Sequence, residues 1–146
     1  MLGKGEWALK FNCNFLLNTG LMGNGLIPDG ERFVLEGIGK WISVNKSFIY
    51  NSCGTDILAD NADIFYDGEF YYAVIKKVPM RTNANVASAD NNKIVTIKTD
   101  KKIVFARWLD NGKSIKVINK NSFFIEPFSY GYSFGARVAK FKLKKL

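Results

Sequence analysis

Residues 14–50 read NFLLNTGLMGNGLIPDGERFVLEGIGKWISVNKSFIY, and this stretch contains the clearest structural pattern in the chain. It opens with a short apolar run at residues 15–17, which ends at Asn18 as a buried strand entering a loop does. A glycine-rich crossing then leads to Asp29, which is placed to cap a helix. The order of strand, loop and helix predicts a βα unit that needs further strands beside it. We expect residues 1–13 to be too few to supply them.

The predicted helix carries an apolar stripe along one side. Its large apolar residues recur with helical spacing at Val34, Leu35, Ile38, Trp41 and Ile42. Leaving such side chains in water forfeits roughly 1.5–3 kcal/mol for each of them, and an exposed apolar patch usually marks an interface. We therefore predict an interface at Val34, Ile38 and Trp41, covered by another part of the fold or by a second copy of the chain.

The same stretch resembles the end of the catalytic barrel in glycoside hydrolase family 29 α-L-fucosidases. The family pattern runs Gly-Asn-Leu-Leu-Leu-Asn-Ile-Gly-Pro, then Asp-Gly-x-Ile-Pro, Leu-x-x-Ile-Gly-x-Trp-Leu and Asn-Gly-Glu-x-Ile-Tyr. The matching positions are Asn14, Leu16, Leu17, Asn18, Gly20, Gly25, Ile27, Pro28, Leu35, Ile38, Gly39, Lys40, Trp41, Asn45, Ile49 and Tyr50. The departures, mainly in loops around the active-site face, are Cys13 for Gly, Thr19 for Ile, Leu21 for Pro, Asn24 for Asp and Lys46-Ser47 for Gly-Glu.

The composition is typical of a folded domain. Of 146 residues, 47% are apolar and 12 are Phe, which is enough to build a core and excludes a disordered tail. The absence of histidine removes the commonest general acid–base group and the commonest metal ligand. Cys13 and Cys53 are too few for a disulfide framework or a zinc site, so we expect plain thiols. Neither a signal peptide nor a membrane span is predicted, and the chain as it stands is expected in the cytoplasm.

The hydrophobic period changes from helical to two at Ala62. Short strands are predicted at residues 64–66, 70–78, 93–98, 102–109, 113–118, 122–125 and 136–143. The pairs Asp67-Gly68 and Asn111-Gly112 predict type I′ hairpin turns. Seven short strands with tight turns and no helix are typical of an antiparallel β-sandwich. The strand at Tyr72-Ala73-Val74, the second hairpin and the last strand are also similar to the β-sandwich that follows the barrel in these fucosidases.

The predicted fold class is therefore mainly β, an antiparallel β-sandwich preceded by a strand–loop–helix remnant of a (β/α) barrel. We assign residues 1–50 to the barrel end, residues 51–61 to a polar linker and residues 62–146 to the C-terminal β-sandwich. Within these parts, residues 7–11 and 47–50 are expected to be extended.

The acidic residues between 56 and 69 are the obvious pool for a catalytic pair or a calcium loop. A retaining glycosidase needs two carboxylates about 5 Å apart, but these positions fall in a polar linker and a hairpin turn, and their spacing fits no calcium-binding loop. The resemblance implies that both catalytic carboxylates and the sugar-holding histidines lie upstream of Asn14. We predict no catalytic residue, metal or cofactor here, and an inactive chain by itself. Asn14 and Asn18 either face the substrate side of the barrel or cap loops.

Two further features invite a nucleic-acid interpretation. The net charge is +8, and Lys140, Lys142, Lys144 and Lys145 form a row on the last strand, while Tyr130 to Gly135 is an aromatic loop. A lysine row on the open face of a terminal strand more often blocks edge-to-edge pairing, and the loop lacks the flanking helices of an RNA-binding domain. Nucleic acid and membrane are therefore not expected as partners.

These observations predict the C-terminal accessory portion of an α-L-fucosidase-like glycosidase. The expected partner is a catalytic barrel or a second copy of the chain, with a fucosylated glycan as a candidate ligand. Without a barrel, we predict self-association through residues 14–44. The alternative function is a free-standing carbohydrate-binding or scaffold β-sandwich, and nucleic-acid binding by the basic face is third.

Overall fold

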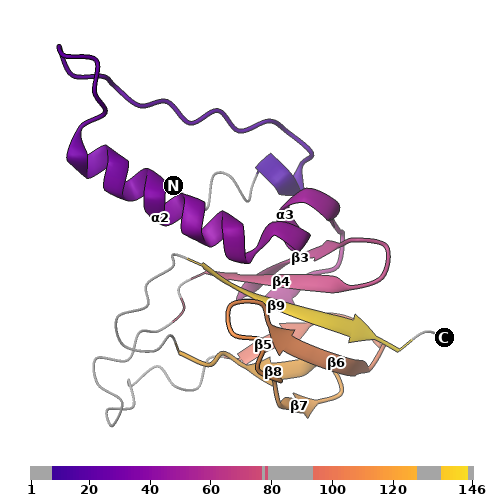
Figure 1. The fold of residues 1–146 in the computed structure, drawn as a ribbon. Helices are drawn as coiled ribbons and strands as arrows, with labels where there is room; N and C mark the ends of the chain where they lie inside the picture. The colour runs from indigo at the N-terminus through magenta and orange to yellow at the C-terminus, as the bar shows by residue number, and fades with distance from the viewer. Residues whose placement is uncertain (1–7, 77, 79–93, 128–135, 145–146) are drawn as a thin grey trace, which may run out of the picture.

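The computed structural model describes residues 8–76, 78, 94–127 and 136–144, and these form two antiparallel sheets with helices across one of them (Figure 1). The five-stranded sheet has the order β1-β3-β4-β9-β6, and the four-stranded sheet has the order β2-β5-β8-β7. The strands are β1 (Cys53–Gly54), β2 (Ala59–Asp60), β3 (Ala62–Tyr66), β4 (Tyr71–Lys76), β5 (Ile94–Ile97), β6 (Ile103–Trp108), β7 (Val117–Asn119), β8 (Ser122–Phe124) and β9 (Ala136–Leu143). The sequence-based prediction of an antiparallel β-sandwich is confirmed.

The main core lies between the two sheets. Strand β9 alternates as predicted, with Ala139, Phe141 and Leu143 buried in this core while Lys140 and Lys142 point to the opposite face. Trp108 on the large sheet packs edge-on against Phe123 on the small sheet, with ring centroids 6.2 Å apart. The period-two pattern therefore located this core correctly in the second half of β9, where only one face of the strand is fully buried.

A second core lies on the outer face of the five-stranded sheet, beneath α2 (Asp29–Val44) and α3 (Lys46–Asn51). Trp41 is only 7% exposed, and its indole Nε1 donates to the carbonyl of Ala136 at 2.8 Å. Phe48 is fully buried and contacts the ring of Phe65 at a centroid distance of 5.0 Å. These two aromatic residues fix the C-terminal half of α2, together with α3, on the sheet.

Several local predictions are wrong. Residues 15–17 form no strand, because no neighbouring strand in the described chain offers them backbone partners, and Phe15 and Leu16 are exposed. Residues 8–10 are helical rather than extended, and residues 47–50 lie in α3, where Phe48 gains a buried position. Asp29 is the first residue of α2 and does not cap it; its carboxylate instead accepts a hydrogen bond from Arg32.

The segment expected to be a linker contains two short strands. β1 pairs with β3, and β2 pairs with β5, so residues 51–61 add one strand to each sheet. Gly54 is required here, because a Cβ atom at this position would collide with the backbone carbonyl of Lys10. The assignment of a domain boundary to this segment stays a prediction.

Both glycine turns form, although neither is of type I′. That type needs a positive φ at both central residues, and only Gly68 (97°) and Gly112 (68°) have one. The preceding polar side chains close the turns instead. Asp67 accepts from two backbone N–H groups of its turn, and Asn111 accepts from the N–H of Lys113.

The lysine row needs a different explanation from the one predicted. β9 lies between β4 and β6, so it has no free edge for lysines to protect. The Tyr130–Gly135 loop and Lys145 lie outside the described residues. Within the described chain, no helix is long and apolar enough to span a membrane.

Candidate functional site

The candidate site is formed by the N-terminal half of α2 and by the segment that leads into it. Residues 11–28 contain no helix or strand, and they run alongside α2 before turning back into its first turn (Figure 1). The reversal is closed by two backbone hydrogen bonds, from Met22 N to the carbonyl of Leu26 and from Gly25 N to the carbonyl of Met22, each 2.8 Å long. Gly25 has a φ of 79°, which explains why glycine is needed at this turn.

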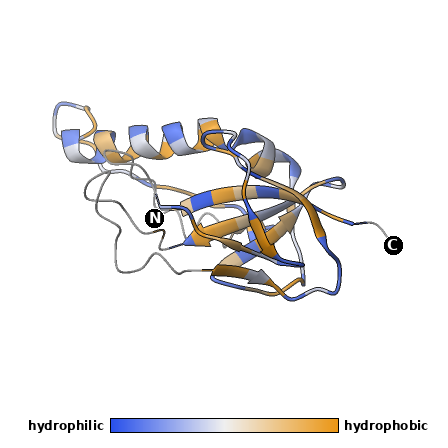
Figure 2. Cartoon of the chain, turned by 90° about the horizontal axis from the view of Figure 1, so that it is seen from below, coloured by the Kyte–Doolittle hydropathy of each residue, from blue (hydrophilic) through white to orange (hydrophobic). Residues whose placement is uncertain are grey.

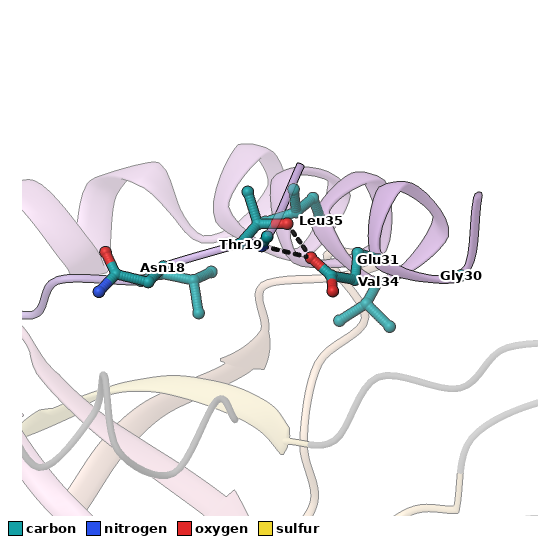
Figure 3. A pocket seen from close by; sticks show the side chains of 8 residues that line it. Asn18, Thr19, Gly30, Glu31, Val34 and Leu35 are labelled. Atoms are coloured by element: carbon teal, nitrogen blue, oxygen red, sulfur yellow. Dashed lines mark hydrogen bonds between the residues drawn. The ribbon is translucent and has the colours of Figure 1, made fainter. Parts of the chain in front are cut away.

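Glu31 fastens this segment to the helix. Its Oε2 accepts hydrogen bonds from the Thr19 hydroxyl and from the backbone N–H of Gly20, the latter at 3.2 Å (Figure 3). A carboxylate in the first turn is also favoured by the helix dipole. Glu31 was not singled out from the sequence, although the enrichment of acidic residues in the first turn of a helix was an available signal.

A pocket of about 290 Å³ lies between the two segments (Figure 3). Its lining residues are Leu17, Asn18, Thr19, Gly20, Gly30, Glu31, Val34 and Leu35. The lining is largely apolar, and among the described residues that form it Glu31 alone has an ionisable side chain. One carboxylate cannot serve as an acid–base pair, so the arrangement suits packing against another surface better than glycoside chemistry.

Large apolar side chains are exposed around this pocket. Figure 2 shows apolar residues alternating with polar ones along α2, and Trp41, at its C-terminal end, is buried against the sheet. The N-terminal half leaves Phe33 78% exposed and Val34 43% exposed. We define the α2 docking surface by five of the exposed apolar residues of this half and of the segment beside it: Leu16, Leu21, Leu26, Phe33 and Val34.

The predicted site residues are divided among different environments. Asn18 lines the pocket, whereas Asn14 is exposed and does not line it. Val34 is exposed and Ile38 is half-buried, so both remain predicted interface residues. Trp41 is already buried by its own chain and is not available to a partner. Phe33 was not predicted as an interface residue because it does not belong to the apolar stripe by which the helix was predicted.

Four of the five acidic residues between 56 and 69 have structural partners. Asp63 bridges Lys10 and Lys76, at 2.5 and 2.8 Å, and ties the N-terminal helical turn to the sheet. Asp60 pairs with Lys98, Glu69 pairs with Lys142, and Asp56 is exposed. No three His, Cys, Asp or Glu residues gather to hold a metal in the described ranges, and Cys13 and Cys53 are exposed free thiols.

Asp67 and Tyr72 form a hydrogen-bonded pair in which both pKa values are shifted. The Tyr72 hydroxyl donates to Asp67 Oδ2 at 2.5 Å. Burial, and then this hydrogen bond to a carboxylate, raise the pKa of Tyr72 well above its ordinary value. For Asp67, burial acts to raise the pKa, but the hydrogen bonds from Phe70, Tyr72 and Glu69 outweigh it and lower the pKa. The pair holds the hairpin in place and keeps Asp67 ionised.

Comparisons with known proteins agree on the fold. No family model and no curated protein sequence matches the chain. Among solved structures, α-L-fucosidase isoenzyme 1 from Paenibacillus thiaminolyticus is 20% identical with a TM-score of 0.72, and the match covers 98% of this chain and 33% of that one. A GH29 α-L-fucosidase from Bacteroides thetaiotaomicron is 18% identical with a TM-score of 0.66, covering 94% and 30% of the two chains.

The α-fucosidase of Thermotoga maritima, solved with fucose, matches with a TM-score of 0.59 and 16% identity over 92% of this chain and 31% of that one. The present chain therefore spans about a third of the length of the fucosidases that it matches. The similarity inferred from residues 14–50 is confirmed at the level of the fold, since α2 and the β-sandwich together have the fold of one portion of these α-L-fucosidases.

Proposed function

We propose that this chain is the C-terminal accessory portion of an α-L-fucosidase-like glycosidase. The observation that carries the proposal is the coverage of the structural matches, which take in nearly all of this chain but only about a third of each fucosidase. The remaining two thirds of those proteins are the natural source of a surface that would pack on α2.

The exposed residues of the α2 docking surface support the same proposal. Phe33 and Leu16 are 78% and 82% exposed, and burying a large apolar side chain is worth about 1.5–3 kcal/mol. A catalytic (β/α) barrel covering the α2 docking surface would recover that free energy. In this arrangement Asn18, at the pocket, lies next to the barrel and is the better candidate for a substrate-side position, while Asn14 stays a weaker candidate.

The role of the chain in this proposal is structural. The C-terminal half of α2 is anchored on the sheet through Trp41, and the N-terminal half of α2 exposes apolar residues that the barrel would cover. Hydrolysis of an α-L-fucoside would be carried out by carboxylates of the barrel. The chain by itself is predicted to be inactive.

The proposal is tested by adding the purified chain to the barrel portion of the Paenibacillus enzyme, expressed without the third that this chain matches. We expect the two to co-migrate on gel filtration and the mixture to hydrolyse an aryl α-L-fucoside faster than the barrel alone. A Phe33→Ser/Leu16→Ser chain should do neither, whereas Phe124→Ser, at a 45% exposed residue on β8, serves as the matched control. Turnover by the chain alone that is lost on changing Asp56 or Asp60 would overturn the proposal.

A further inference from the structure

A second surface of interest lies on the outer face of the five-stranded sheet, away from the docking surface. Along β9 the residues on this face are Ala136 and Val138, which the helices cover, followed by Lys140 and Lys142, which they leave half-exposed. The register places Arg107 of β6 opposite Lys140 and Phe105 opposite Lys142. With Phe70, these side chains form what we call the aromatic–basic patch: Phe70, Phe105, Arg107, Lys140 and Lys142.

The two rings of the patch hold its cations in place. Phe70 and Phe105 pack at an angle of 61° with centroids 6.0 Å apart. Lys140 Nζ lies 3.7 Å from the centroid of Phe70, and Lys142 Nζ lies 5.0 Å from it. The guanidinium carbon of Arg107 lies 5.7 Å from the centroid of Phe105. Cations that are already ordered by cation–π contacts lose less conformational entropy when they bind an anion.

The patch keeps an excess of positive charge. Lys142 is paired with Glu69 at 2.9 Å, but within the described chain Arg107 and Lys140 form no ion pair with a carboxylate. The nearby Asp67 accepts hydrogen bonds from the Tyr72 hydroxyl and from two backbone N–H groups, and the charge of Lys140 also helps to lower the pKa of Asp67, although the two groups form no direct ion pair. Arg107 and Lys140 therefore have no direct carboxylate partner in the described chain and can approach an external anion, and the side chain of Phe105, 38% exposed, provides apolar surface beside them.

We propose that the aromatic–basic patch binds the anionic groups of an acidic polysaccharide. The patch lies on an open sheet face, which suits a long polymer with repeated negative groups better than a small ligand. Single-stranded nucleic acid is a poorer fit because base stacking needs an open ring face, and the lysines occupy the face of Phe70. The choice of a glycan among polyanions rests on the proposed function.

The test is isothermal titration calorimetry of the whole chain with a sulfated fucan, the same fucan after desulfation, alginate, and a single-stranded oligothymidylate. We expect the sulfated fucan to bind and the desulfated form to bind at least about tenfold more weakly. Alginate shows whether carboxylates can replace sulfates. Arg107→Gln/Lys140→Met should weaken binding about tenfold or more, whereas Lys113→Gln/Lys116→Met removes the same charge from exposed positions elsewhere and should change it little.

The contribution of the aromatic residues to binding is tested with separate variants. Phe105→Leu should weaken binding several-fold, and Phe124→Leu, at an exposed phenylalanine on the other sheet, should not. Equal losses of affinity in Arg107→Gln/Lys140→Met and in Lys113→Gln/Lys116→Met would mean that only net charge matters and would overturn the proposal. Tighter binding of oligothymidylate than of the sulfated fucan would overturn it too, as would the absence of binding to both the sulfated fucan and alginate. The patch variants leave Phe33 and Leu16 unchanged. A failure to bind the glycan would therefore not affect co-migration with the barrel, and a failure to bind the barrel would not affect glycan binding at the patch.

Discussion

Arg137 shows how much of the sandwich depends on one buried charge. Its side chain is 3% exposed, and it pairs with Asp110 through two hydrogen bonds of 2.8 and 3.2 Å while donating to the backbone carbonyl of Glu126. Its guanidinium also lies 4.0 Å from the ring centroid of Trp108. The group therefore joins β9 to the hairpin after β6 and to the chain after β8.

Removing this charge is expected to be costly. Arg137→Met leaves Asp110, which is 10% exposed, without its buried cation, and breaking such a pair costs about 3–5 kcal/mol. Urea unfolding followed by tryptophan fluorescence measures the change in the free energy of unfolding. Lys142→Met breaks a pair whose side chains are 35% and 64% exposed, and it should cost less than about 1 kcal/mol. Similar losses of unfolding free energy in the two variants would mean that breaking the Arg137–Asp110 pair does not have the cost expected of a buried ion pair.

Asp67 makes stability depend on pH in the acid range. Because its pKa is lower in the folded state than the ordinary value of 3.8, the ionised form stabilises the fold above that value. This contribution is lost as the pH falls through the lowered pKa of the folded state. Asp67→Asn should therefore unfold more easily than the native chain at neutral pH, with the difference shrinking as the pH drops below 3.8.

Chemical denaturation across that pH range measures the difference directly. Glu69→Gln is the matched control, since this carboxylate lies in the same turn and its side chain is 64% exposed. A constant difference between native and Asp67→Asn chains at every pH would show that the carboxylate acts by shape rather than by charge.

At the scale of elements, α2 has two halves with different tasks. Trp41 is buried and hydrogen-bonded to Ala136, so Trp41→Ala opens a cavity and should cost about 3–5 kcal/mol. Phe33 on the exposed half contacts solvent, so Phe33→Ser should change the free energy of unfolding by no more than about 0.5 kcal/mol. Thermal melts and urea titrations of the two variants check this. A large loss in Phe33→Ser would mean that the N-terminal half of α2 is buried within a monomer.

Sequence reasoning succeeded where one face of an element sets its pattern. The alternation of Ala139, Phe141 and Leu143 with lysines fixed β9, and the apolar spacing fixed α2. It failed at residues 15–17, whose apolar composition is that of a strand although no strand among the described residues pairs with them. It also failed at α3, because Phe48 is drawn into a helical turn by tertiary packing against Phe65 and Tyr72.

For the whole molecule, the sandwich and its relation to the fucosidases were predictable, but the sites were not. The carboxylate partners of Lys10, Lys142 and Arg137 lie 53, 73 and 27 residues away along the chain, so no local sequence pattern predicts these pairs. The aromatic–basic patch likewise depends on the register between β6 and β9. The lysine row was visible in the sequence, whereas the rings that order it were not.

The α2 docking surface leads to a last prediction, about assembly. In the absence of a barrel, the α2 docking surface leaves Leu16 and Phe33 in water, and association of two copies through residues 14–44 would bury them. Sedimentation velocity across a dilution series should show a reversible increase in mass with concentration. Phe33→Ser/Leu16→Ser should shift it toward the monomer, while Lys140→Met and Phe124→Ser leave it unchanged.

Adding the fucosidase barrel tests whether the barrel and a second copy of the chain bind to the same surface. If both use the same residues, the barrel competes with self-association, and the dimer disappears as the mixed complex forms. Trp41→Ala is unsuitable as an interface probe because it acts on folding. A monomer at every concentration, together with a barrel complex that is insensitive to Phe33→Ser/Leu16→Ser, would contradict the prediction that a second copy or the barrel packs on Phe33 and Leu16, because large apolar side chains at the centre of a contact contribute to its affinity.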